Sequence, residues 1–122
     1  MKIIKSLFCA ATAACALTCM SVSAQTILLV PQDDRPVSLA YTVSTAERAG
    51  YKVLTPPQSI LSGSSYKGNA DRVWSWVEDN ISKADAAVLS TDTLIYGGLV
   101  DSRKHNESLA TLQSRENRIE LL

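Results

Sequence analysis

The stretch LLVPQDDRPV, residues 28–37, decides how this chain begins to fold. The apolar run that reaches it from Thr26 and ends at Val30 has the composition of a buried strand. Two adjacent acids, Asp33 and Asp34, follow it together with Arg35, and a proline stands on each side of this group. The stretch therefore predicts a strand that ends in a charged turn or at the edge of a binding site.

The chain beyond this stretch alternates between helical and strand-like segments. Pro36 suits the first turn of a helix and Gly50 its end, so a helix is predicted over residues 36–48. Further strands are predicted at 51–54 and 86–90, further helices at 70–82 and 106–122, and irregular chain at 58–69 and 91–104. This order is typical of an α/β fold, in which a parallel sheet alternates with helices through right-handed crossovers.

Two architectures fit three parallel strands: the N-terminal part of a (β/α) barrel and that of a doubly wound domain. We prefer the barrel order 1-2-3, in which Thr55-Pro56-Pro57 lies between the ends of strands one and three. In the doubly wound order 2-1-3, strands one and three are neighbours instead. An open sheet edge and an uncapped last helix lead us to expect an incomplete domain over residues 25–122, truncated at its C-terminus. A complete small domain is the alternative.

Residues 1–24 have the features of a secretory signal peptide. Lys2 and Lys5 precede an apolar run over residues 7–17, and small residues end at Ala24, the expected cleavage site. We therefore expect an exported protein, periplasmic or extracellular. The three cysteines all lie in this segment, so a lipid anchor is an alternative, as is an uncleaved membrane anchor. The mature chain has no cysteine for a disulfide.

The charge of the chain restricts its partners. It has 12 basic and 12 acidic residues, and this balance argues against nucleic acid as a partner. Contact with a membrane is expected only through the signal peptide or a lipid anchor. A small molecule or a carbohydrate is the expected ligand.

The charged residues that follow the strands are the candidate catalytic groups. Ligands of parallel α/β folds bind beyond the carboxyl ends of the strands. Asp33 and Asp34 follow strand one, and Asp92 follows strand three, so these three acids are predicted to share one rim. Arg35 is a candidate partner for a carboxylate or an anionic ligand. Asp34 and Asp92 are equally well explained as a helix cap and a turn.

Residues after Asp92 are candidate ligand contacts. They are Tyr96, Gly97, Gly98 and Arg103. Tyr96 also suits the core, and the two glycines also suit a tight turn. Of Trp74 and Trp76, one is expected in the core and the other partly exposed. The single histidine, His105, is expected in solvent, so neither a metal site nor a cofactor is predicted, although a metal requirement stays open.

Two segments resemble the bacterial family called domain of unknown function 4127. ILLVPQDDRPVS resembles its signature Val-Pro-Leu-Asp-Asp-Arg-Pro-Val-Asn, and LSTDTLIYGGLVDSR resembles Leu-Ser-Leu-Asp-Met-Leu-Leu-Tyr-Gly-Gly-Leu-Val-Ala-Ser-Arg. The residues that match are Pro31, Asp33, Asp34, Arg35, Pro36 and Val37, then Ser90, Asp92, Leu94, Tyr96, Gly97, Gly98, Leu99, Val100, Ser102 and Arg103. The departures are Gln32, Ser38, Thr91, Thr93 and Asp101. The resemblance implies a considerably longer complete protein and supplies no function.

The leading functional hypothesis is a hydrolase that acts on carbohydrate. Asp33 and Asp92 would be its pair of catalytic carboxyl groups, supported by Asp34 and Arg35, with Tyr96 and Arg103 in contact with substrate. The alternative is a non-catalytic exported protein that holds a ligand on the same rim. Both hypotheses predict that Asp33 or Asp34 shares a pocket with Asp92, and that an arginine pairs with one of these acids.

Overall fold

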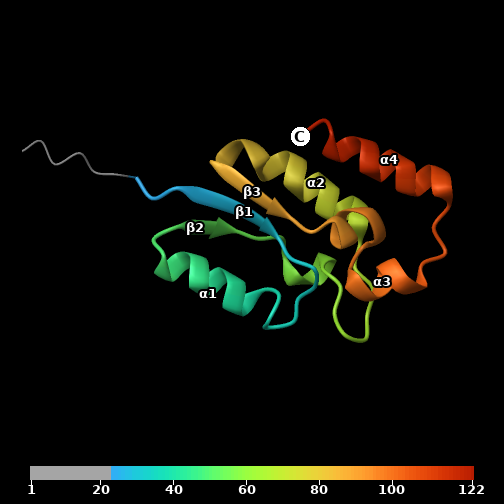
Figure 1. Ribbon diagram of the computed structural model, residues 1–122, viewed down its shortest axis with the longest axis horizontal. Coiled ribbons are helices and arrows are strands. Elements are labelled where there is room, and N and C mark those ends of the chain that lie inside the picture. The colour runs from blue at the N-terminus through green and yellow to red at the C-terminus, as the bar shows by residue number, and fades with distance from the viewer. Residues whose placement is uncertain (1–22) are drawn as a thin grey trace, which may run out of the picture.

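The fold is a three-stranded parallel sheet with helices on both faces, given by a computed structural model that describes residues 23–122 (Figure 1). The predicted signal peptide, residues 1–24, lies almost wholly outside the described residues, so its cleavage and the export of the protein stay predictions. Within the described part, no helix has both the length and the apolar character needed to cross a bilayer.

The strands are β1 (Thr26–Val30), β2 (Lys52–Leu54) and β3 (Ala86–Leu89), and their order is β2-β1-β3. Leu28 of β1 is aligned with Leu54 of β2 on one side and with Ala87 of β3 on the other. The predicted α/β class is confirmed. The preferred barrel order is wrong, because β1 and not β2 is the central strand.

The burial of the strands explains this order. Leu28, Leu29 and Val30 of β1 are all buried, as expected of a strand that is paired on both edges and covered on both faces. By contrast, β2 begins with the exposed Lys52, and Val88 in β3 is 56% exposed. The strand with the most large aliphatic side chains therefore takes the centre, where it removes most apolar surface from water.

Helix α1 (Ala40–Arg48) covers one face of the sheet and α2 (Ala70–Asn80) covers the other (Figure 1). The α2 helix carries the main core face, with Val73, Trp74 and Val77 fully buried. Asn69 caps it, as its side chain accepts a hydrogen bond from the backbone N–H of Arg72 at 3.0 Å. Short 3₁₀ turns, η1 (Gln58–Ile60) and η2 (Ile81–Lys83), lie before and after α2.

The predicted start of the first helix and the predicted irregular segment 91–104 are both wrong. Residues 36–39 form consecutive turns, and α1 begins only at Ala40. The segment after β3 contains a five-residue π-helix, η3 (Asp92–Tyr96), and a short helix, α3 (Leu99–Lys104). Gly97 lies between them with a φ of 101°, a conformation that glycine adopts without steric strain. The sequence prediction missed these short helices because two adjacent glycines are typical of a turn rather than of a helix.

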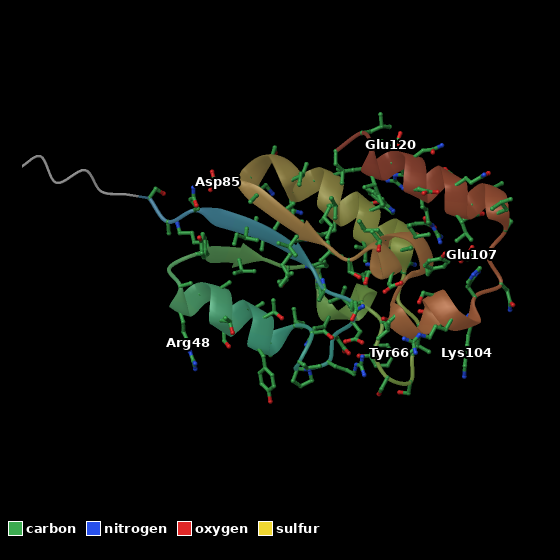
Figure 2. All side chains as sticks on the ribbon, in the orientation of Figure 1. Arg48, Tyr66, Asp85, Lys104, Glu107 and Glu120 are labelled. Carbon is green, nitrogen blue, oxygen red and sulfur yellow. The ribbon has the colours of Figure 1, made fainter. Side chains whose placement is uncertain are left out.

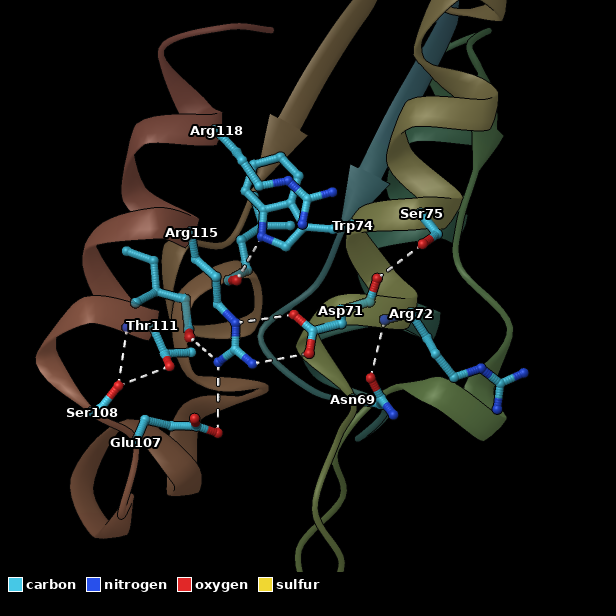
Figure 3. Close-up of polar contacts among 12 residues, drawn as sticks. Asn69, Asp71, Arg72, Trp74, Ser75, Glu107, Ser108, Thr111, Arg115 and Arg118 are labelled. Atoms are coloured by element: carbon cyan, nitrogen blue, oxygen red, sulfur yellow. Dashed lines mark hydrogen bonds and ion pairs between the residues drawn. The ribbon is translucent and has the colours of Figure 1, made fainter.

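Arginines dock the last helix, α4 (Leu109–Ile119), onto the fold, together with Ile119, which packs against the core (Figure 3). Leu109 is 70% exposed, whereas Arg115 is buried and donates to the Ile95 carbonyl at 2.8 Å. Arg115 also forms an ion pair with Asp71 of α2 at 3.2 Å. The predicted helix, residues 106–122, is correspondingly longer than the observed one.

The two tryptophans behave as predicted. Trp74 is buried and donates from Nε1 to the Leu94 carbonyl at 2.8 Å, while Trp76 is partly exposed. The guanidinium carbon of Arg118 lies 4.6 Å from the centroid of the Trp74 ring, so a cation–π contact adds to the docking of α4 (Figure 3).

Candidate functional site

A crevice opens where β1 and β3 end side by side. Its volume is about 540 Å³, within the range of small-molecule sites. Its walls are Leu29, Val30, Pro31, Gln32, Arg35, Val37, Ser38, Thr42, Val88, Leu89, Ser90, Thr91 and Asp92. Apolar strand residues therefore line one part of the crevice and polar residues of the two following turns line the other. We call this cavity the crevice.

The position of the crevice follows from the strand order. From β1 the chain passes to α1 on one face of the sheet, and from β3 it passes toward α4, which lies beside α2 on the opposite face (Figure 1). Two neighbouring parallel strands whose connections leave in opposite directions form a gap at their carboxyl ends. Open α/β sheets bind their ligands at this switch point.

Gln32 connects the two strand ends across the crevice. Its side-chain amide donates from Nε2 to Oδ2 of Asp92 at 3.2 Å. The neighbouring main chain is joined as well, since the hydroxyl of Thr93 donates to the Pro31 carbonyl at 2.6 Å. Sequence reasoning did not include Gln32 among the candidates. The available signal was a polar residue at the position where the signature has leucine.

Asp33 forms an internal ion pair with Arg35. The Asp33 side chain is buried, and its Oδ2 lies 2.8 Å from Nε and 2.6 Å from Nη2 of Arg35. Burial alone would raise the pKa of Asp33. Hydrogen bonds from the side chains of Arg35 and Ser38 and from the Arg35 backbone, with the charge of Arg35, outweigh burial and hold this pKa below its ordinary value. Asp33 is therefore an anion that holds Arg35 in place. A carboxyl group with a lowered pKa is poorly suited to donate a proton to a substrate.

One edge of the Arg35 guanidinium group is free to bind a ligand. Its Nε and Nη2 atoms face Asp33, whereas Nη1 has no hydrogen-bond partner among the described residues. The Arg35 side chain is 43% exposed and lines the crevice. The pKa of Arg35 is raised, first by the hydrogen bond to Asp33 and then by its charge. A fixed, permanently charged donor therefore borders the crevice.

Asp34 points to a different neighbour, the serine-rich loop of residues 61–69. Its carboxylate accepts a hydrogen bond from the hydroxyl of Tyr66, and its backbone N–H donates to the Ser62 carbonyl at 2.9 Å. This hydrogen bond to Asp34 is the main reason that the pKa of Tyr66 is raised. Asp34 does not cap α1, since the capping position belongs to Leu39, which makes no side-chain capping bond.

A family model described as protein of unknown function (DUF4127) matches residues 27–122. The chain belongs to the DUF4127 family. The match covers both signature segments and every described helix and strand except the first residue of β1. No curated protein and no solved structure matches the chain.

In this DUF4127 protein, the second signature segment mainly packs the fold together. Gly97 and Gly98 are buried against the serine-rich loop: a Cβ on Gly98 would meet the side chain of Ser62, and a Cβ on Gly68 would meet the Gly97 carbonyl. Tyr96 contacts His105, with 4.8 Å between the ring centroids. Neither this tyrosine nor either glycine lines the crevice.

The predicted site is therefore corrected in part. Neither Asp33 nor Asp34 lines the crevice that contains Asp92, so the prediction of a shared pocket is wrong. Asp33 is paired with Arg35 instead, and Asp34 accepts a hydrogen bond from Tyr66. The expected pairing of an arginine with one acid is confirmed by Arg35 and Asp33. Arg103 is exposed in the last turn of α3 and does not line the crevice.

The described part of this DUF4127 protein shows no clustered set of metal ligands. Across residues 23–122, no three His, Cys, Asp or Glu side chains come together in a group that could hold an ion. His105, predicted to lie in solvent, is instead partly buried beside Tyr96. The polar groups of the crevice offer hydrogen bonding and charge: one carboxylate, one guanidinium edge, hydroxyl groups and a side-chain amide.

Proposed function

We propose that this DUF4127 protein is exported and binds a small hydroxyl-rich ligand, with carbohydrate as the first class to test, in the crevice between β1 and β3. The observation that carries the proposal is the crevice itself. It lies at the switch point of the sheet, and Asp92 and Arg35 both line it.

The lining of the crevice supports this ligand class. The Asp92 carboxylate accepts one hydrogen bond from Gln32 and has further lone pairs for ligand hydroxyls. Nη1 of Arg35 supplies a donor, and the hydroxyls of Ser38 and Ser90 can act in either sense. Leu29 and Val88 provide an apolar surface, which suits the C–H face of a sugar ring. A ligand with many hydroxyls and one apolar face uses all of these groups.

Hydrolysis of that ligand is the second candidate function. The observation that favours it is the position of Asp92, a carboxylate on the crevice wall and held by Gln32. Glycosidic cleavage ordinarily requires two carboxyl groups about 5–10 Å apart on either side of the bond. Asp33 is committed to Arg35 and does not line the crevice, so binding without turnover is the function that the geometry supports better.

One set of variants separates the two functions. Binding of glucose, galactose and glucuronate to the purified protein is measured by calorimetry, and release of reducing ends from a panel of polysaccharides is measured in parallel. Asp92→Ala should weaken binding about tenfold, the value of one charge-assisted hydrogen bond. Asp92→Asn retains an acceptor and should bind nearly as well as the parent.

The two candidate functions differ most in turnover. If the protein is a hydrolase, Asp92→Asn should lower the rate of product release by a factor of about 10²–10⁴, while sugar binding persists. If it is a binding protein, no polysaccharide releases product above the rate in buffer. Equal affinity of the parent and Asp92→Ala for every sugar would exclude the crevice as the binding site.

A further inference from the structure

The crevice has an unbalanced negative charge. Two charged side chains line it, those of Arg35 and Asp92. The charge of Arg35 is balanced by Asp33, whose Oδ2 lies 2.6 Å from Nη2 of the arginine. Asp92 forms no ion pair with any basic residue in the described part of the chain. The crevice therefore offers a ligand a surplus of one carboxylate, although an arginine lines it.

The acid next to Arg35 in sequence adds to this surplus. The carboxylate of Asp34 accepts a hydrogen bond from Tyr66, which Figure 2 shows at the end of the molecule toward which the strands run. After the hydrogen bond and the charge of Asp33, the charge of Asp34 is a further cause of the raised pKa of Arg35. The arginine thus already interacts with two anions, and an anionic ligand would gain less from it than from a free arginine.

Asp92 is held in place by its neighbours. It begins the π-helix η3, and the next residue, Thr93, is fully buried and donates from its hydroxyl to the Pro31 carbonyl at 2.6 Å. Gln32 donates to Oδ2 of Asp92, whereas Oδ1 receives no hydrogen bond from a described residue. Asp92 is exposed, in contrast to the buried Asp33. A fixed carboxylate with one oxygen left for a ligand therefore borders the crevice.

An ammonium group suits this carboxylate better than a hydroxyl does, because it supplies a positive charge as well as donors. In an amino sugar, an ammonium group takes the place of one hydroxyl, and the other hydroxyls remain for Ser38 and Ser90. We infer that the crevice prefers amino sugars to neutral and acidic sugars, with the ammonium group of the ligand on Asp92. This inference rests on the proposed binding of carbohydrate and adds the charge of the ligand to it.

An acidic sugar is the competing ligand class. Nη1 of Arg35 has no hydrogen-bond partner among the described residues and is the one charged donor that the crevice offers to a uronate. The balance of charge decides against this class. A uronate would bring its carboxylate close to Asp92 and to the anion that already neutralises Arg35, whereas an amino sugar would neutralise Asp92. The expected order of affinity is amino sugar, then neutral sugar, then acidic sugar.

Calorimetry of the purified protein with four related sugars tests this order. They are glucosamine, glucose, N-acetylglucosamine and glucuronate, measured at about pH 6, where an amino group with an ordinary pKa of about 8 is protonated. Glucosamine should bind about fivefold more tightly than glucose, the value of one exposed ion pair. N-acetylglucosamine keeps the nitrogen without its charge and should lack this advantage. Glucuronate should bind more weakly than glucose.

Two variants assign the preference to Asp92. In Asp92→Asn the ratio of the glucosamine and glucose affinities should fall to about one, because the charge is lost and the shape is kept. Asp79→Asn is the matched control: it removes the same charge from an exposed position on α2 outside the crevice, and it should keep the ratio of the parent. If Asp92→Asn does not fold, salt decides instead. Raising the salt to about 0.5 M should reduce the ratio in the parent, since exposed charges are then screened.

The inference and the proposed function fail in different ways. Saturable binding of glucose in the crevice with no preference for glucosamine would overturn the inference alone. So would glucuronate or N-acetylglucosamine binding as tightly as glucosamine, or a ratio that is unchanged both in Asp92→Asn and in high salt. Absence of binding by all four sugars would overturn the proposed function and this inference with it.

Discussion

The side-chain amide of Gln32, two residues after β1, donates a hydrogen bond of 3.2 Å to the carboxylate of Asp92, three residues after β3. Sixty residues separate the two in sequence. Their contact spans the carboxyl ends of neighbouring parallel strands, and both side chains line the crevice. The bond orients the carboxylate that the proposed function uses to receive a ligand.

Gln32→Leu should weaken ligand binding in the crevice and change stability little. The variant removes the donor that orients Asp92, but Gln32 is exposed, so the free energy of unfolding should fall by no more than about 1 kcal/mol. Calorimetry with the best-binding sugar and urea unfolding measure the two effects. Gln58→Leu, in η1 and outside the crevice, is the control. Unchanged affinity in Gln32→Leu would show that the contact plays no part in binding.

Arg35→Met should destabilise the protein, because it leaves the buried Asp33 carboxylate without its counter-ion. The free energy of unfolding should fall, but by less than for a fully buried pair, because Arg35 is half-exposed. Asp33→Asn combined with Arg35→Met should recover part of this loss, because no unpaired charge remains. A double variant as unstable as Arg35→Met alone would contradict the assigned role of the pair.

The pH dependence of stability has a definite sign at Asp33. Its pKa in the folded protein lies below the ordinary value of 3.8, so the ionised form binds its partners in the folded state. The stabilisation is therefore fully present above pH 3.8 and disappears as the pH falls through the lower, folded pKa. Urea unfolding between pH 2 and 6 should show this loss in the parent, and a smaller one in Asp33→Asn. If the free energy of unfolding depends on pH equally in the parent and in Asp33→Asn, the lowered pKa of Asp33 is contradicted.

Gly98→Ala should destabilise the protein by about 1–3 kcal/mol, since the added methyl group would overlap the side chain of Ser62. Ser62→Gly in the same chain should relieve most of the overlap. Gly50→Ala is a useful contrast: its Cβ would meet nothing within 4 Å, so its cost comes only from the φ of 93°. Thermal unfolding distinguishes these cases. Absence of any rescue by Ser62→Gly would mean that the serine-rich loop does not pack as described.

Arg115→Met should loosen α4, because the Ile95 carbonyl and Asp71 lose their donor. The expected cost is about 1–3 kcal/mol, compared with about 0.5–1 kcal/mol for Arg118→Met, which loses a cation–π contact and an ion pair with Glu78. Leu109→Ala should be neutral within about 0.5 kcal/mol. Hydrogen exchange of α4 amides measures all three. A larger effect from Leu109→Ala than from Arg115→Met would contradict the docking of α4 through its arginines.

Much of the fold was predictable because apolar runs report strands directly. The α/β class followed from three such runs, and Thr26–Val30 was predicted with its observed bounds. The strand order was also within reach: a central strand must be apolar on both faces, and TILLV satisfies this while Lys52 marks β2 as an edge strand. Comparing the strands with one another would have favoured the order 2-1-3.

The details of the site were less predictable, since they depend on contacts between distant residues. Sequence placed Asp33, Asp34 and Asp92 on one rim, but each carboxylate has a different partner: Arg35, Tyr66 and Gln32. Adjacent acids in a turn point in different directions, and the pattern alone does not say which one faces a cavity. The docking of α4 through a buried arginine was hidden for the same reason, because Asp71 lies 44 residues away in sequence.

The most direct test of the central claim is a map of where carbohydrate binds. Amide chemical shifts of the purified protein are recorded while glucose, galactose and glucuronate are added in turn to roughly 100 mM, far above the ~1 mM at which a −4 kcal/mol complex half-saturates. We predict saturable shifts for at least one sugar at Gln32, Arg35, Ser38 and Asp92, and their loss in Asp92→Ala. Saturable shifts confined to any other part of the protein, or none with all three sugars, would contradict the assignment of the crevice.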